Sequence, residues 1–115
     1  MHVFITFFYA KSLILFFVTM LHIRKGTPND MPAVLDLITE LAIFEKEPNA
    51  VVITAEDLIR DGFSETPLFH TFVAEVKEEI IGVALYYYRF STWKGKTIHL
   101  EDLIVKENNR GTGAG

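Results

Sequence analysis

Three strand-forming segments joined by short connections constrain the fold of this chain more than any other feature. Residues 69–76 and 80–90 are rich in aromatic and β-branched residues, and a charged turn at 77–79 separates them. A third such segment, residues 97–105, follows a loop at 91–96. Connections this short favour antiparallel neighbours, because a parallel pair needs a long crossover. The three segments therefore predict an antiparallel meander.

Two helices are expected ahead of this meander. Thr27 and Asp30 have the spacing of a capping box, and Thr54 and Asp57 repeat it. After the first box, apolar residues recur at helical spacing, at Val34, Leu37, Ile38, Leu41 and Phe44. A short strand over residues 22–25 precedes the first helix. The predicted fold class is α+β, with strand, helix, helix and then the three-strand antiparallel meander.

Length and composition indicate one globular domain and reduce the classes of ligand that the chain is expected to bind. The 115 residues are half hydrophobic, which is enough for one packed core. The net charge of −4 argues against nucleic acid, whose binding needs clustered Lys and Arg. There is no cysteine, and the four histidines lack metal-ligand spacing, so we expect no metal. The absence of cysteine agrees with a cytoplasmic location.

The first 21 residues differ from the rest, because they are strongly apolar and carry one charge, Lys11. Their length is close to the roughly 20 residues of a membrane helix. A central lysine would cost such a helix about 2.5–3.5 kcal/mol on the insertion scale. The segment from Met20 to Arg24 is typical of the opening strand of a domain. We therefore expect residues 1–21 to be a leader, upstream of the true start or poorly ordered, and residues 22–115 to form the domain. A membrane anchor through residues 1–21 is the alternative.

An apolar strand bearing two carboxylates leads into a glycine-rich turn. Glu101 and Asp102 lie on the strand, and the sequence Arg110-Gly111-Thr112-Gly113-Ala114-Gly115 follows it. Successive N–H groups of such a turn can converge on phosphate oxygens. Adjacent strand residues point to opposite faces, so one carboxylate faces a cleft or solvent and the other the helix layer. Apolar neighbours would partly desolvate a carboxylate, which suits a general base, but a solvent-facing acid fits the pattern equally well.

These motifs resemble a known family. Residues 110–115 match the Arg/Gln-x-x-Gly-x-Gly/Ala motif of the GNAT N-acetyltransferases, and Leu100-Glu101-Asp102-Leu103 resembles the Leu-Glu-Asp-Phe of the spermidine/spermine and thialysine branch. Further segments resemble that branch in the same order, at residues 23–24, 40–42, 44–45, 58–63, 73–76, 81–87 and 93–96. The resemblance spans residues 22–115 and implies the N-terminal half of a GNAT fold.

The resemblance implies acetyl transfer from acetyl-CoA to a primary amine of a small polyamine-like or lysine-like substrate. Glu101 would be the general base, because the amine arrives as an ammonium ion. The acetyl carbonyl and pantetheine arm would bind the backbone amides of Leu103, Ile104 and Val105, which would also stabilise the oxyanion. The pyrophosphate would bind Arg110 and the amides of Gly111, Thr112, Gly113, Ala114 and Gly115.

The resemblance also implies an amine pocket and a partner. Carboxylates attract an ammonium ion, and an indole packs on its alkyl chain or over its charge. The pocket would be lined by Phe44, Glu45, Trp93 and Asp102. A homodimer is a further expectation from the family.

Three parts of the family pattern lie beyond the printed sequence: a general-acid tyrosine, the helix behind the glycine turn and a splayed strand. A chain without them would be expected to lack catalysis and to bind the coenzyme weakly. Its last strand would lack a neighbour, which leaves an exposed edge. The alternative function is therefore a non-catalytic fragment that acts as a binding or interaction module.

Overall fold

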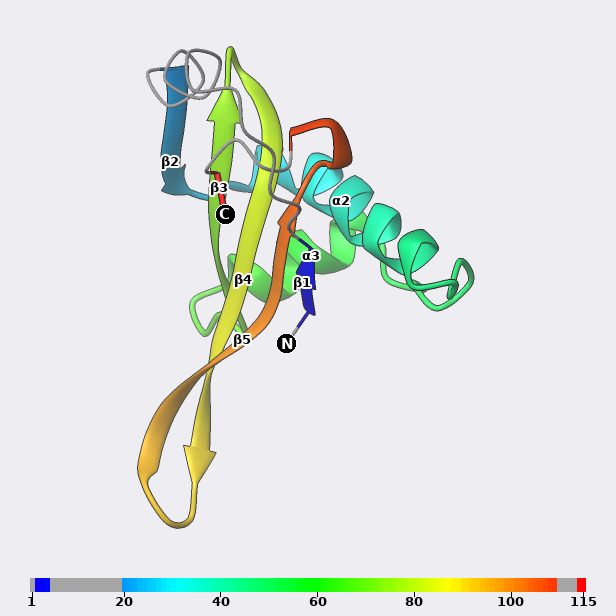
Figure 1. Ribbon diagram of the computed structural model, residues 1–115. Helices are drawn as coiled ribbons and strands as arrows, with labels where there is room; N and C mark the ends of the chain where they lie inside the picture. The colour runs from blue at the N-terminus through cyan, green and yellow to red at the C-terminus, as the bar shows by residue number, and fades with distance from the viewer. Residues whose placement is uncertain (1, 5–19, 110–113) are drawn as a thin grey trace.

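The computed structural model describes residues 2–4, 20–109 and 114–115 (Figure 1). These described residues form two α-helices, α2 (Met31–Phe44) and α3 (Ala55–Gly62). The strands are β1 (His2–Phe4), β2 (Leu21–Lys25), β3 (His70–Val76), β4 (Glu79–Ser91) and β5 (Gly95–Val105). Short 3₁₀ turns precede α2 at Pro28–Asp30 and follow β5 at Glu107–Asn109. The predicted α+β order of strand, helix, helix and meander is confirmed.

One mixed sheet holds all five strands in the order β1-β5-β4-β3-β2. The predicted meander of β3, β4 and β5 is antiparallel throughout, and β2 adds antiparallel to β3. The β3–β4 connection is a two-residue turn, because Val76 pairs with Glu79. β4 and β5 continue past the rest of the sheet as a long two-stranded arm (Figure 1). The arm ends in the turn that carries Trp93.

The expectation that the last strand lacks a neighbour is wrong. β1 pairs in parallel with β5, in the register His2–Asp102, Val3–Leu103 and Phe4–Ile104. The partners lie at opposite ends of the sequence, so no local spacing predicts this pair. An edge strand presents unpaired N–H and C=O groups that accept an extended segment able to reach them. Residues 5–19, most of the expected leader, lie outside the described residues.

Both predicted capping boxes begin a helical segment. The Thr54 N–H donates to Asp57 Oδ2 at 2.9 Å, and the Asp57 N–H donates to Thr54 Oγ1 at 3.1 Å. In the first box the Thr27 N–H and hydroxyl both donate to Asp30 Oδ2, at 2.7 and 2.9 Å. These bonds satisfy donors that helix starts leave unpaired, which explains why the spacing predicted the starts correctly.

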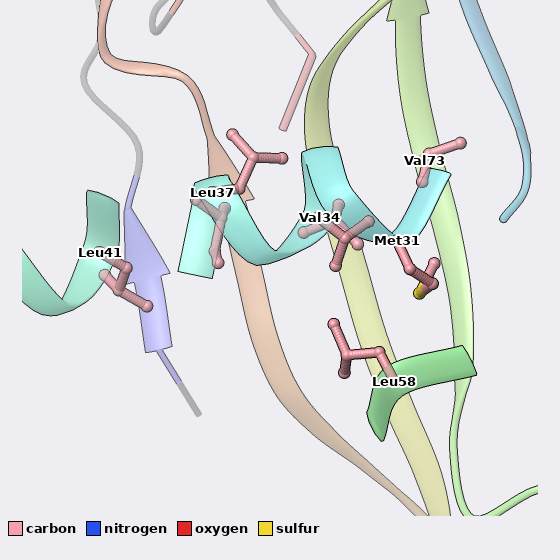
Figure 2. Close-up of a cluster of buried hydrophobic side chains, with 8 residues drawn as sticks. Met31, Val34, Leu37, Leu41, Leu58 and Val73 are labelled. Carbon is pink, nitrogen blue, oxygen red and sulfur yellow. The ribbon is translucent and has the colours of Figure 1, made fainter. Parts of the chain in front are cut away.

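The main core lies between the helices and one face of the sheet (Figure 2). It is a cluster of buried apolar side chains from both helices and from β3, β4 and β5: Met31, Val34, Leu37, Leu41, Leu58, Val73, Val83 and Ile104. A second, smaller cluster joins Ala74 and Ile81 to Leu21, Val76 and Ala114. β5 therefore contributes to the core through Ile104, two residues after Asp102.

Candidate functional site

The centre of the candidate site is a β-bulge in β5 at Glu101. Leu85 pairs with Asp102 and Tyr86 pairs with Leu100, which leaves Glu101 as an extra residue on β5. The strict alternation expected for Glu101 and Asp102 therefore does not hold across this point. Bulges redirect side chains and are common beside active sites. The sheet thus singles out the residue that the sequence predicts to be the general base.

Glu101 is more open to solvent than its apolar neighbours suggest. Its side chain is 45% exposed, so water reaches the carboxylate. His99 Nε2 lies 3.4 Å from Glu101 Oε2, and the His99 ring packs at a tilt against Tyr87 with centroids 5.1 Å apart. The spacing of His99 and Glu101 in the sequence indicates this contact, because residues two apart on a strand share a face. His99 is the site residue that motif reasoning missed.

An apolar groove of about 280 Å³ adjoins the carboxyl end of β5. Leu103, Ile104 and Val105 line it together with β3, β4 and the last two residues of the chain. Ile104 and Val105 are buried as whole residues. Gly82 keeps the strands close at this point, because a Cβ there would lie 3.0 Å from the Ile104 carbonyl oxygen.

Part of the predicted glycine turn can be placed. Ala114 packs against the small cluster of Ala74 and Ile81, and both Ala114 and Gly115 line the groove. The last two residues of the sequence therefore lie against the sheet, with Ala114 packed on β3 and β4. Arg110, Gly111, Thr112 and Gly113 lie outside the described residues.

An ion pair and hydrogen bonds hold the segment that leads into this turn against the rest of the domain. Lys106 Nζ lies 2.6 Å from Glu79 Oε1, and the Lys106 N–H donates to the Ile81 carbonyl at 2.7 Å. The Glu79 carboxylate raises the pKa of Lys106. The Glu107 N–H donates to Glu40 Oε1 of α2 at 2.9 Å. These contacts fix the point from which the glycine turn departs.

The remaining predicted site residues are dispersed. Phe44 is 62% exposed in the last turn of α2, and Glu45 follows it at the surface. Trp93 is 93% exposed at the tip of the arm. At about 3.3 Å per residue, the six residue steps along β5 from Gly95 to Glu101 span roughly 20 Å. Asp102 lies next to Glu101 on β5, and neither of these carboxylates nor any of the other three residues lines the groove.

This geometry agrees with the comparison to known families. Residues 33–115 match the acetyltransferase (GNAT) family. The chain belongs to the GNAT acetyltransferase family. The GNAT match includes the bulged strand, the glycine turn and every residue of the groove lining except Ile23.

Relatives of this GNAT chain confirm the expected branch. The thialysine N-epsilon-acetyltransferase of Bos taurus is 44% identical over 101 aligned positions, and the match covers 81% of this chain and 59% of that protein. Spermidine/spermine N(1)-acetyltransferase-like protein 1 of Homo sapiens is 40% identical over 100 aligned positions, and the match covers 81% of this chain and 14% of that protein. The chain therefore spans little more than half the length of the Bos taurus enzyme.

Solved structures support the GNAT fold. An aminoglycoside acetyltransferase from an uncultured soil metagenomic sample, in complex with sisomicin, has a TM-score of 0.66 at 23% identity. The match covers 85% of this chain and 64% of that chain. A crystal structure of Trypanosoma brucei acetyltransferase matches with a TM-score of 0.57 at 22% identity, over 82% of this chain and 66% of that chain. At these identities the likeness shows the fold alone.

Two further properties of the described GNAT residues bear on ligands. No group of three or more His, Asp or Glu side chains among residues 2–4, 20–109 and 114–115 is arranged to hold a metal ion. Within the same residues, no helix has the length and apolar character needed to cross a bilayer.

Proposed function

We propose that this chain is an N-acetyltransferase domain that transfers an acetyl group from acetyl-CoA to a primary amine. The substrate class we propose is a small polyamine-like or lysine-like amine, because the relatives at 40–44% identity are named for spermidine/spermine and thialysine. The observation that carries the proposal is the bulge, which sets Glu101 apart on the same strand as Leu103, Ile104 and Val105, three residues that line the groove.

The groove suits the acyl donor in its chemistry. Acetyl-CoA supplies an activated thioester on an extended arm that contains both amide groups and methylene segments. The apolar lining would accept the methylene segments, and backbone groups of Leu103, Ile104 and Val105 would bind the acetyl carbonyl and the amides. The pyrophosphate would bind Arg110 and the amides of residues 111–115, of which Ala114 and Gly115 border the groove.

Glu101 would remove the proton that prevents the amine from reacting. A primary amine is an ammonium ion near neutral pH and has no lone pair with which to attack a thioester. The partly exposed carboxylate of Glu101 can accept this proton directly or through one water molecule. Donors on the β5 backbone would stabilise the negative charge that develops on the acetyl oxygen.

The residues proposed to form the amine pocket lie on separate elements of the fold. Asp102 would attract the cationic substrate from its position next to Glu101. Phe44, Glu45 and Trp93 lie on other elements, at the end of α2 and at the tip of the arm. They would line the pocket together with Asp102 once a second copy or the bound substrate closes it, and a homodimer is therefore part of the proposal.

The test is acetyl transfer by the full chain. The protein is mixed with acetyl-CoA and a panel of diamines and lysine analogues, and the release of free thiol is followed. We expect turnover with at least one amine, and we expect Glu101→Gln to lower the rate by about 100-fold or more. The matched control is Glu65→Gln, a carboxylate in an exposed loop, with a rate within about twofold of the parent.

The outcomes separate the proposal from its alternative. If no amine is acetylated while coenzyme A still binds, the chain is a non-catalytic binding module and acetyl transfer by this chain is ruled out. If Glu101→Gln retains full turnover, the assignment of the base is wrong.

A further inference from the structure

The edge of β5 beside the bulge carries an unexpected strand. β1 pairs with Asp102, Leu103 and Ile104, which begin directly after Glu101. No other described strand lies on this side of β5, because β4 takes the opposite edge. The chain's own N-terminal segment therefore occupies the backbone next to the proposed base.

This edge is also where the proposed acyl donor has to bind. An extended arm with amide groups can pair with a strand edge in the way that an added peptide strand does. Leu103 and Ile104, two of the three residues proposed to hold that arm, are in register with Val3 and Phe4. Each backbone N–H can donate one good hydrogen bond, so one stretch of edge cannot serve both partners at once.

We propose that β1 is a displaceable strand that blocks the acyl-donor edge of β5, so that pairing of β1 and binding of coenzyme A exclude each other. The inference rests on the proposed function, because it assigns regulation to the same site. A strand of three residues makes few ladder bonds, which suits a segment that is to be released. The apparent affinity for coenzyme A would equal the intrinsic affinity multiplied by the fraction of molecules whose edge is open.

Proline substitutions in the full chain test this exclusion with an internal control. Successive strand residues direct their N–H groups to opposite sides, so Val3 and Phe4 do not both donate to β5. Proline has no N–H and is tolerated in an edge strand only where that N–H would face away from the sheet. Val3→Pro and Phe4→Pro therefore form a matched pair, of which one breaks the ladder and the other spares it.

Two measurements are made on the parent and both variants. Amide hydrogen exchange by NMR reports pairing through those N–H groups of residues 102–104 that point towards β1, and titration with free coenzyme A reports affinity. We expect one variant to speed exchange at this edge and to bind coenzyme A about tenfold more tightly, and the other to resemble the parent. Coenzyme A added to the parent should speed exchange at His2–Phe4 while it protects the β5 edge. Thermal unfolding confirms that each variant is folded.

Three results would overturn the inference, and they leave different conclusions for the proposed function. If neither proline alters exchange at residues 102–104, β1 does not hold this edge. If one opens the edge and the affinity for coenzyme A stays equal or weakens, β1 does not compete with the donor, and the proposed function stands if the parent acetylates amines. If neither the parent nor the opened variant binds coenzyme A, the proposed function fails as well.

Discussion

At the residue scale, the carboxylate of Asp30 organises the entry to α2. Arg24 donates to its two oxygens at 2.7 and 2.9 Å, and the Thr27 N–H and hydroxyl add two more bonds. Arg24 also reaches Glu75 of β3 at 2.9 Å, so one guanidinium joins β2, β3 and the start of the helix. The Arg24 hydrogen bonds, offset in part by burial, lower the pKa of Asp30 to about 2.

This low pKa predicts a loss of stability in acid. The pKa of Asp30 is lower in the folded state than its ordinary value of 3.8, so its contribution is complete above pH 4 and is lost as the pH falls through 2. A shift of this size corresponds to about 2 kcal/mol. Urea unfolding between pH 2 and pH 6 should show that loss, and Asp30→Asn should remove it.

The matched control at this scale is Asp57→Asn. Asp57 belongs to the other capping box and its side chain is 32% exposed, more than that of Asp30. Its substitution should therefore reduce the acid dependence of stability much less. An unchanged acid profile in Asp30→Asn would show that other carboxylates dominate.

At the element scale, the β3–β4 turn is made from residues that do not favour its backbone. Lys77 and Glu78 both have positive φ, 49° and 68°, as a type I′ turn requires. Asparagine and glycine adopt this conformation readily, whereas other residues lose about 1 kcal/mol or more each. The charged turn predicted from the sequence is present, but its left-handed backbone is visible only in the structure.

The double substitution Lys77→Asn with Glu78→Gly should therefore stabilise the domain by about 1 kcal/mol. The gain is measured as an increased urea midpoint with an unchanged slope. Glu78→Ala keeps the backbone penalty and should bring no gain. Equal stability of all three proteins would mean that the turn carries no strain.

At the scale of the whole molecule, Ile104 links the candidate site to the core. It is fully buried, it belongs to the cluster that joins both helices to the sheet, and it lies in the strand segment that lines the groove. The strand that offers backbone groups to the proposed donor is thus held in place by its own side chains.

Ile104→Ala should lower the free energy of unfolding by about 3 kcal/mol, because it leaves a cavity at the centre of the core. Ile98→Ala removes the same atoms from a side chain on the arm that is 64% exposed. It should change stability by no more than about 0.5 kcal/mol. Urea denaturation of both variants checks the contrast, and similar losses would show that the arm also packs in solution.

The sequence by itself determined the helix starts and the meander, because caps, short turns and strand composition act between residues close in the chain. Its motifs also indicated the family. The Thr54 box and the β3–β4 turn are decided within a few positions. Only the tertiary structure decided the bulge at Glu101, the convergence of Arg24, Asp30 and Glu75, and the pairing of β1 with β5. Each of these depends on contacts between distant segments, which exist only once the sheet has set its register.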